Sequence, residues 1–395
     1  MVNERMRFII LVSIVGISGF SQGMLLPLIA IIFEQQGVSS SINGLHATAL
    51  YIGILIISPF LEPPLKKFGY KPLILFGGVL VFVSLFSFTI WDSIWVWFIL
   101  RLLVGIGDNI LHFGSQTWIT TTTAEHKRGR NIAIYGLAFA LGFATGPLMV
   151  RLLEVNQHLP FIISSILCLI VWSFMFFVRN DFPVEEDEVQ ITSTSSFQRF
   201  IQATKLSWVA FLAPFAYGFL EATLNGNFPV YGMRIGHDPN ALSIIIPSFA
   251  AASIISQIPL GVLSDKFGRP KVLSFVFLGG VIAFFLAARL EDSALALLAM
   301  FIVAGLFVGS LFSLGMSYMA DLLPKSLLPA GNILCGIAFS FGSISGPIFG
   351  GLFIDFFPEI SFFTLIALFL TVVLVILFFS QRKAILKRAL NDSYS

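Results

Sequence analysis

The sequence predicts an all-α polytopic membrane protein with twelve transmembrane helices, and composition, segment length and loop charge all indicate this fold class. Apolar residues make up 57% of the 395 residues and charged residues only 11%, against about 25% charged in an ordinary soluble domain. A transmembrane helix needs about 20 mainly apolar residues, and such segments follow one another from Phe8 to Gln381. An outer-membrane barrel is disfavoured because its strands would alternate in hydropathy.

Short polar or Gly/Pro breaks separate the apolar segments. The helices are predicted at residues 8–33, 42–66, 71–91, 94–123, 130–153, 157–178, 207–234, 240–265, 270–289, 293–322, 326–354 and 358–381. With Met1 placed in the cytoplasm, 19 of the 23 Lys and Arg residues lie on the inner side and three lie in outer loops. Because cytoplasmic loops are enriched in these residues, both termini are expected inside.

Residues 179–206 form the one long polar stretch and divide the chain into two six-helix halves. Its acidic run, residues 185–188, favours a solvated cytoplasmic linker, although the phenylalanines near its end leave a surface helix open. The expected domains are an N-terminal bundle at 1–178, a linker at 179–206, a C-terminal bundle at 207–381 and a cytoplasmic tail at 382–395.

The two halves repeat each other in sequence. Residues 135–147 and 335–347 share Gly, Ala, Phe, Gly, Gly and Pro at positions displaced by 200. A Gly-Phe pair also precedes Gln22 in the first predicted helix and Glu221 in the seventh. Duplication at a six-helix period is typical of transporter folds, whose substrate site lies near the midplane between the repeats.

One inner-loop motif resembles the major facilitator superfamily. The turn after the eighth helix fits the family pattern G-x-x-x-D-[RK]-x-G-[RK] through Gly261, Asp265, Gly268 and Arg269. The resemblance covers the whole chain and implies two pseudo-symmetric six-helix bundles. It also implies that this turn latches one conformation, with Asp265 near a helix N-terminus that favours an anion.

The matching first-half turn departs from the pattern. Lys66 stands where the acid belongs, and Glu62 stands where the glycine belongs. The usual first-half latch is therefore not expected. Glu62 and Lys66 are four residues apart and can pair with each other, although two prolines, Pro63 and Pro64, are expected to distort the helix between them.

A second motif, R-x-x-x-G-x-G, resembles a pattern associated with proton-coupled members of the family. It is carried in the fourth helix by Arg101 and two glycines, and it is followed by Asp108 and His112. At 100° per residue these three side chains fall on one helix face. Asp108 lies about 20 Å from the outer helix end, where an ionisable group is costly, so we predict a cavity-facing functional role. A structural Arg101–Asp108 pair is the alternative.

A third motif resembles the G-x-x-x-G-P-x-x-G-G pattern associated with antiporters. It occurs twice, at Gly142, Gly146 and Pro147 and at Gly342, Gly346 and Pro347. In the first copy the final glycine pair is replaced by Val150 and Arg151. Small residues four apart also allow close helix packing, so packing alone is the other interpretation.

Other polar residues at mid-depth complete the candidate pathway. Glu221 and Asn225, one turn apart, are predicted to form a substrate or proton site, and Gln22 is the matching position in the first helix. A hydrogen bond to a neighbouring helix is the alternative role for Glu221. His46 is interpreted as a structural residue.

Several other functions are disfavoured. A net charge of +2 without a basic stripe implies no nucleic-acid partner, and two cysteines within apolar segments imply no metal or disulfide. The segment Gly105 to Asp108 matches the G-x-G-D of intramembrane aspartyl proteases, but its Tyr-Asp partner is absent from the sequence. No P-loop is present, so ATP-driven transport is not expected. No enzyme activity and no cofactor are predicted.

The expected function is transport of a small solute by alternating access, driven by protons that bind Asp108 and Glu221, with Arg101 tuning Asp108. The motifs favour export of an amphipathic or drug-like compound. Uptake of a sugar, amino acid or other metabolite and transport of a lipid are the alternatives. A monomer in a bacterial inner membrane is expected, and the sequence leaves the substrate, direction and coupling ion open.

Overall fold

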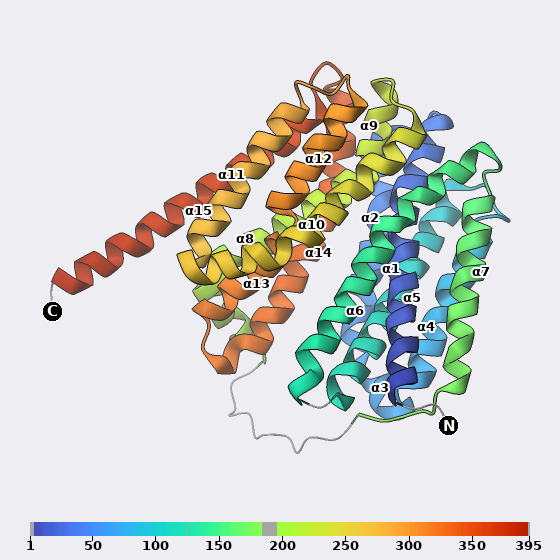
Figure 1. Cartoon of the computed structure of the whole chain (residues 1–395), viewed down its shortest axis with the longest axis horizontal. Helices are drawn as coiled ribbons and strands as arrows, with labels where there is room; N and C mark the ends of the chain where they lie inside the picture. The colour runs from blue at the N-terminus through green and yellow to red at the C-terminus, as the bar shows by residue number, and fades with distance from the viewer. Residues whose placement is uncertain (1–3, 124, 184–195, 394–395) are drawn as a thin grey trace. The chain divides into compact units, whose positions relative to one another are not determined.

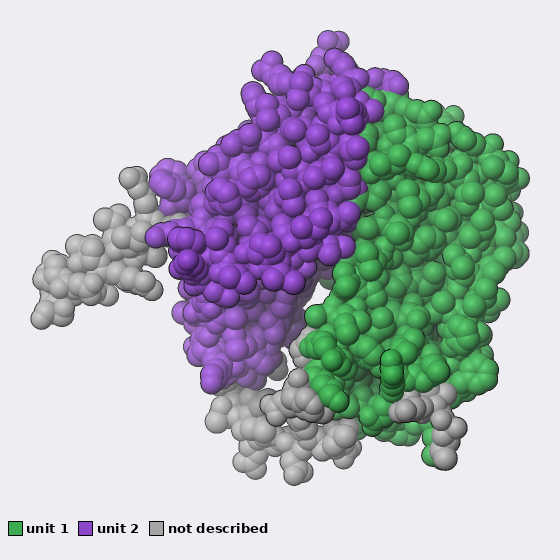
Figure 2. All heavy atoms as spheres, in the orientation of Figure 1, with its two compact units in different colours: residues 1–191, 225–233, 237–247 green, residues 192–224, 234–236, 248–395 purple. Residues whose placement is uncertain are grey.

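The computed structural model describes residues 4–123, 125–183 and 196–393, and these residues contain helices but no strand. The chain divides into two compact units, shown in different colours in Figure 2. One unit holds residues 1–191, 225–233 and 237–247, and the other holds residues 192–224, 234–236 and 248–395. Residues 225–233 and 237–247, which follow residue 206 in the sequence, group with the first unit.

Twelve helical stretches in the described part of the chain are long and apolar enough to cross a membrane, as predicted. Large apolar side chains also lie exposed on their surfaces, including Trp95, Ile258 and Leu295, each more than 70% exposed. Lipid is the solvent that tolerates such surfaces. The described chain is therefore built as a multi-pass membrane protein.

The first-half helices run side by side in Figure 1. They are α1 (Glu4–Gln35), α2 (Ser40–Ile57), η1 (Ser58–Phe60), α3 (Glu62–Phe68), α4 (Tyr70–Ser87), α5 (Ile94–Thr122), α6 (Glu125–Thr145), η2 (Gly146–Glu154), α7 (Leu159–Ser173) and η3 (Phe174–Phe177). Helix α1 packs on α6 and η2, while α5 packs between α2 and α4. This places α5, which carries Arg101, Asp108 and His112, in the interior of the unit.

The predicted single helix at 42–66 was wrong, because α2, η1 and α3 divide it. Pro59 lies in η1, and Pro63 and Pro64 open α3. Proline removes a backbone donor and clashes with the preceding turn, so it is accepted at the first positions of a helix and not inside one. The predicted Glu62–Lys66 pair is confirmed, with 2.8 Å between Oε1 and Nζ.

The second-half helices follow the same order. They are α8 (Ser196–Gly226), α9 (Phe228–Arg234), α10 (Pro239–Phe267), α11 (Arg269–Ala287), α12 (Ala294–Val308), α13 (Leu311–Leu322), η4 (Lys325–Leu327), α14 (Leu328–Phe356) and α15 (Phe362–Ser393). The predicted helix at 293–322 is split at Gly309 and Ser310 into α12 and α13, and the one at 207–234 is split at Asn227 into α8 and α9. Helix α15 continues through most of the predicted tail.

The end of the predicted linker is helical. Helix α8 starts at Ser196, and its backbone leaves helical geometry at Ser207, with φ −131° and ψ 17°. The kink coincides with the predicted start of the seventh transmembrane helix. Before the kink, Phe200 and Ala203 pack against an apolar cluster that includes Met319 and Leu323. The end of the predicted linker is thus helical and packs on the protein, whereas the acidic run at 185–188 lies outside the described residues.

The repeated glycines bring helices into close contact in each half. A side chain at Gly142 or Gly146 would collide with the α1 backbone, and one at Gly342 would collide with the α8 backbone. The two copies differ at proline, since Gly146 and Pro147 begin the 3₁₀ helix η2, whereas Pro347 lies inside the continuous helix α14. Close packing is therefore one established role of these motifs.

Candidate functional site

Asp108 is fully buried, and no other acid among the described side chains of the first unit is buried. Its side chain is 0% exposed, and its Oδ1 accepts a hydrogen bond of 2.6 Å from Ser18 Oγ on α1. The Gln22 amide, one turn further along α1, lies near the same carboxylate. Oδ2 has no hydrogen-bond partner of ordinary geometry among the described residues. Asp108 is thus a buried carboxyl group held mainly by one hydroxyl.

Two glycines in α5 explain why Asp108 is sealed from solvent. A side chain at Gly105 would collide with the backbone of Leu50 on α2, and one at Gly107 would come within 2.7 Å of the Gly77 carbonyl on α4. The glycines let three helices approach closely around this part of α5. The R-x-x-x-G-x-G spacing therefore carries a direct packing role in addition to any role in coupling.

Arg101 forms a separate cluster two turns before Asp108. It is 0% exposed, and its Nη1 lies 3.0 Å from His46 Nδ1 while its Nη2 donates to Leu25 O at 3.5 Å. Because a guanidinium only donates, Nδ1 is the acceptor, and Nε2 of His46 donates to Ile94 O at 3.1 Å. His46 is thus neutral in this arrangement, and the Arg101 charge has no carboxylate in contact within the described chain.

The predicted polar face of α5 is divided among three neighbours. Arg101 turns to His46 on α2, Asp108 to Ser18 on α1, and His112 to Tyr135 on α6, with 2.9 Å between His112 Nδ1 and the Tyr135 hydroxyl. The direct Arg101–Asp108 pair considered from the sequence does not form. Helix periodicity places residues on one face correctly, but it does not say which neighbouring helix each side chain meets.

Glu221, on α8, belongs to the second unit and is partly buried. Tyr217, one turn before it, lies near its carboxylate. The Tyr217 ring stacks on Phe339 with centroids 6.1 Å apart, and Phe312 meets Phe339 edge to face at 5.6 Å. We call Tyr217, Phe312 and Phe339 the aromatic cluster. Asn225, one turn beyond Glu221, groups with the first unit.

The aromatic cluster has a counterpart in the first half. At an offset of 200, Phe312 and Phe339 correspond to His112 and Phe139, which also meet edge to face, with centroids 4.8 Å apart. The Gly-Phe alignment likewise matches Glu221 with Gln22. The edge-to-face pair therefore recurs in both halves, with the polar ring of His112 in the first half replaced by the apolar ring of Phe312 in the second. The repeat offset was the sequence signal for the cluster, which motif matching alone missed.

The inner-loop motif residues lie at the junction of α10 and α11. Gly261 is near the end of α10, and Gly268 makes the turn with φ +92°. Arg269 pairs with Asp265 and, at 3.3 Å, with Asp321 of α13. These charges form a network within the second unit, and no group of three His, Cys, Asp or Glu among the described residues is placed to hold a metal ion.

Comparison with known proteins identifies similar chains. The sequence pattern of the Major Facilitator Superfamily matches residues 11–244 and 206–391. The chain is 53% identical to YfkF of Bacillus subtilis, an uncharacterized MFS-type transporter, over 96% of this chain and 97% of YfkF. It is 23% identical to Multidrug resistance protein 2 of the same organism, with 90% of each chain covered.

Solved structures share the fold. The crystal structure of the nucleoside transporter NupG matches with a TM-score of 0.78 at 14% identity, covering 95% of this chain and 98% of NupG. A bacterial homologue of the human lysosomal transporter Spinster, in an inward-facing and unoccupied conformation, matches with a TM-score of 0.77 at 16% identity, covering 95% of this chain and 96% of the homologue. At such identities the likeness concerns the fold alone.

Proposed function

Because this chain belongs to the major facilitator superfamily, it is a secondary transporter rather than an enzyme, and we propose that it exports a small amphipathic or drug-like compound in exchange for protons. The similarity to Multidrug resistance protein 2 supports export of this kind of compound. The proposal includes cytoplasmic termini, which the distribution of Lys and Arg supports, and a monomer in a bacterial plasma membrane.

The observation that carries the proposal is the environment of Asp108. A carboxylate that is 0% exposed, contacts no cation and leaves one oxygen without a partner in the described chain costs several kcal/mol to keep ionised. Protonation removes that cost. If alternating access wets Asp108 in one state and buries it in the other, proton binding and release follow the conformational change.

Arg101 acts on Asp108 through space. Seven residues of helix separate them by about 10 Å, and at an effective dielectric constant of about 20 two unit charges at that distance attract by about 1–2 kcal/mol. This energy is smaller than the desolvation cost of the carboxylate. Arg101 therefore tunes Asp108 without holding it permanently ionised, as a coupling site requires.

The second unit supplies the proposed substrate contacts. Glu221 adjoins the aromatic cluster of Tyr217, Phe312 and Phe339. Aromatic faces attract organic cations and pack against flat apolar molecules, and a nearby carboxylate adds charge selectivity. Such a surface suits an amphipathic cation better than a sugar, which needs a dense set of hydrogen-bonding groups.

The test is substrate-dependent proton release from liposomes that contain the purified protein. With an imposed pH gradient, ethidium or tetraphenylphosphonium is expected to provoke proton flux in the wild type. Asp108→Asn and Glu221→Gln are each expected to reduce that flux at least about tenfold. Asp292→Asn, which changes an exposed loop acid by the same chemistry, serves as the matched control and is expected to keep wild-type flux.

Two results would contradict the proposal. Proton flux at the wild-type rate in Asp108→Asn would show that Asp108 is not the coupling site, whether or not the protein exports the compound. If no lipophilic cation provokes proton flux in the wild type, and thermal unfolding shows that this protein is folded, drug export would be excluded. Metabolite uptake and lipid transport would then be the functions to assay.

A further inference from the structure

A basic cavity of about 570 Å³ lies in the first unit, at the end of the bundle where α1 begins. It is bounded by the first turns of α1, the last turns of α5 and the first turns of α6. Among the described side chains, four cationic ones line it, from Arg5, Arg7, Lys127 and Arg130, together with one acidic side chain from Glu4. Neither the buried acid Asp108 nor the aromatic cluster belongs to it.

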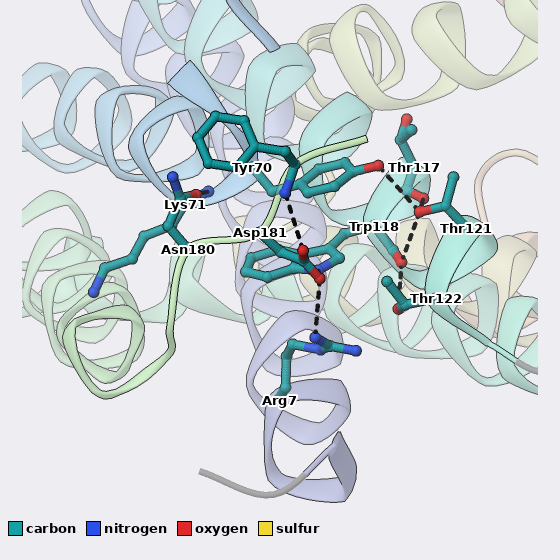
Figure 3. Close-up of polar contacts among 10 residues, drawn as sticks. Arg7, Tyr70, Lys71, Thr117, Trp118, Thr121, Thr122, Asn180 and Asp181 are labelled. Atoms are coloured by element: carbon teal, nitrogen blue, oxygen red, sulfur yellow. Dashed lines mark hydrogen bonds and ion pairs between the residues drawn. The ribbon is translucent and has the colours of Figure 1, made fainter. Parts of the chain in front are cut away.

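Arg7 is held in a defined position at the cavity. Its Nη1 lies 3.5 Å from Asp181 Oδ2, and its guanidinium lies over the Trp118 ring at 5.3 Å from the centroid. The Trp118 indole also donates to Asp181 at 3.4 Å and stacks on Tyr70 at 5.1 Å (Figure 3). A guanidinium has five N–H donors, so one contact to Asp181 leaves donors for a second anion.

The cavity is charged but not uniformly polar. Leu11 and Ile119 form apolar parts of its wall. Ile9 and Ile134, which also line it, are 47% and 38% exposed. An apolar surface beside a cationic cavity fits a ligand with an anionic head and an acyl chain, whereas free phosphate would leave the apolar wall exposed.

The charges favour a phosphate group. Arg binds phosphate through bidentate, charge-assisted hydrogen bonds, and basic pockets between helices at the membrane surface bind anionic lipid head groups. Glu4 and Asp181 offset part of the positive charge but leave an excess of cations. We propose that this cavity binds the phosphate head group of an anionic phospholipid, with Arg7, Lys127 and Arg130 as its principal ligands.

The experiment uses the full chain purified in neutral detergent. Dioctanoyl phosphatidylglycerol, dioctanoyl phosphatidylcholine and inorganic phosphate are added separately, and binding is followed by native mass spectrometry and by the thermal unfolding midpoint. Saturable retention of phosphatidylglycerol, with a raised midpoint, is expected in the wild type. Phosphatidylcholine and inorganic phosphate are expected to give neither effect at the same concentration.

Matched double variants locate the binding. Lys127→Gln/Arg130→Gln removes two exposed charges from the cavity and is expected to weaken phosphatidylglycerol binding at least about tenfold. Lys266→Gln/Lys271→Gln removes the same charge from exposed positions in the second half and is expected to bind as the wild type does. The single variant Lys127→Gln, expected to weaken binding by a smaller factor, serves if the double variant does not fold.

Each alternative outcome is distinct. Equal weakening in both double variants would show non-specific attraction to a basic protein and would overturn the proposal. Protection by inorganic phosphate equal to that by phosphatidylglycerol would make the ligand a free anion and would also overturn the lipid assignment. Neither result depends on transport, so failure here leaves the proposed export function untouched.

Discussion

The two inner-loop turns, one in each half of the chain, occupy equivalent places in the repeat but are fastened in different ways. Both turn at a glycine with positive φ, +83° at Gly69 and +92° at Gly268. The Gly69 turn is held by residues that follow η3, more than 100 positions away. The Gly268 turn carries exposed charges that pair with neighbours.

In the first turn, Asn180 and Asp181 cap the end of α3 and the start of α4, although they are distant in the sequence. Asn180 Oδ1 accepts from Lys71 N at 3.0 Å, and Asn180 Nδ2 donates to Phe68 O at 2.9 Å. Asp181 O accepts from Tyr70 N at 3.0 Å (Figure 3). These bonds satisfy backbone groups at the end of α3 and the start of α4. The start of the linker is thus fixed to the first unit.

In the second turn, the N-cap residue of α11 is Gly268, which has no side chain to cap the helix. Arg269 pairs with Asp265 and Asp321, whose side chains are 64% and 57% exposed. Exposed pairs contribute little stability but can be exchanged at little cost. The half without the family's acidic residue thus has a turn held by backbone hydrogen bonds, whereas the half that keeps the motif has a turn whose contacts can change.

The largest expected effect comes from Gly69→Ala. Backbone geometry of φ 83° and ψ −178° is almost restricted to glycine, and alanine there costs about 1–3 kcal/mol. The new methyl would also lie 2.6 Å from Asp181 O and 2.7 Å from the Asn180 amide, so the cap must move. Adding the cost of losing a cap, about 0.5–2 kcal/mol, gives an expected total loss of about 1.5–5 kcal/mol in the free energy of unfolding, measured by denaturant titration in micelles.

Gly268→Ala is the matched variant for this prediction. It has a similar positive φ, but nothing lies within 4 Å of the added methyl, so only the backbone cost of about 1–3 kcal/mol is expected. Equal destabilisation by the two substitutions would mean that the Asn180–Asp181 contacts add nothing, and the comparison between the two turns would fail.

An intermediate effect is expected from Asn180→Ala. The substitution removes the acceptor for Lys71 N and the donor to Phe68 O, and loss of a cap costs about 0.5–2 kcal/mol. Asn180→Asp keeps the acceptor and loses only the donor, so it should recover part of the loss. Thermal unfolding of the wild type and the two variants measures these effects. An alanine variant as stable as the wild type would show that Asn180 does not stabilise the turn.

Residue patterning was sufficient to predict the helical spans but not these contacts. The twelve apolar segments and the Glu62–Lys66 pair depend on local sequence, and both are present. Asn180 and Asp181 were assigned to a polar linker because nothing in a polar stretch says which distant backbone groups need partners. Their role emerges only when η3 ends beside α3 and α4.

The candidate site shows the same limit. Burial of Asp108 and Arg101 followed from their depth in an apolar segment, and both are fully buried. Their hydrogen-bond partners, Ser18 and His46, were not predicted, because a serine or histidine in an apolar helix usually bonds within its own helix. The neighbour of each side chain depends on how α1, α2 and α6 surround α5, which helix periodicity does not contain.

The smallest effect is expected at the second turn, from Asp265→Asn and Asp321→Asn. Each removes one partner of Arg269 while the other remains, and an exposed pair is worth about 0–1 kcal/mol. We expect a loss of under about 1 kcal/mol for either substitution, and this loss should shrink further in high salt, which screens exposed charges. Denaturant titration at low and high ionic strength measures both values. A salt-independent loss as large as that of Gly69→Ala would show that the second turn is as firmly fastened as the first, and that its charges are structural rather than exchangeable.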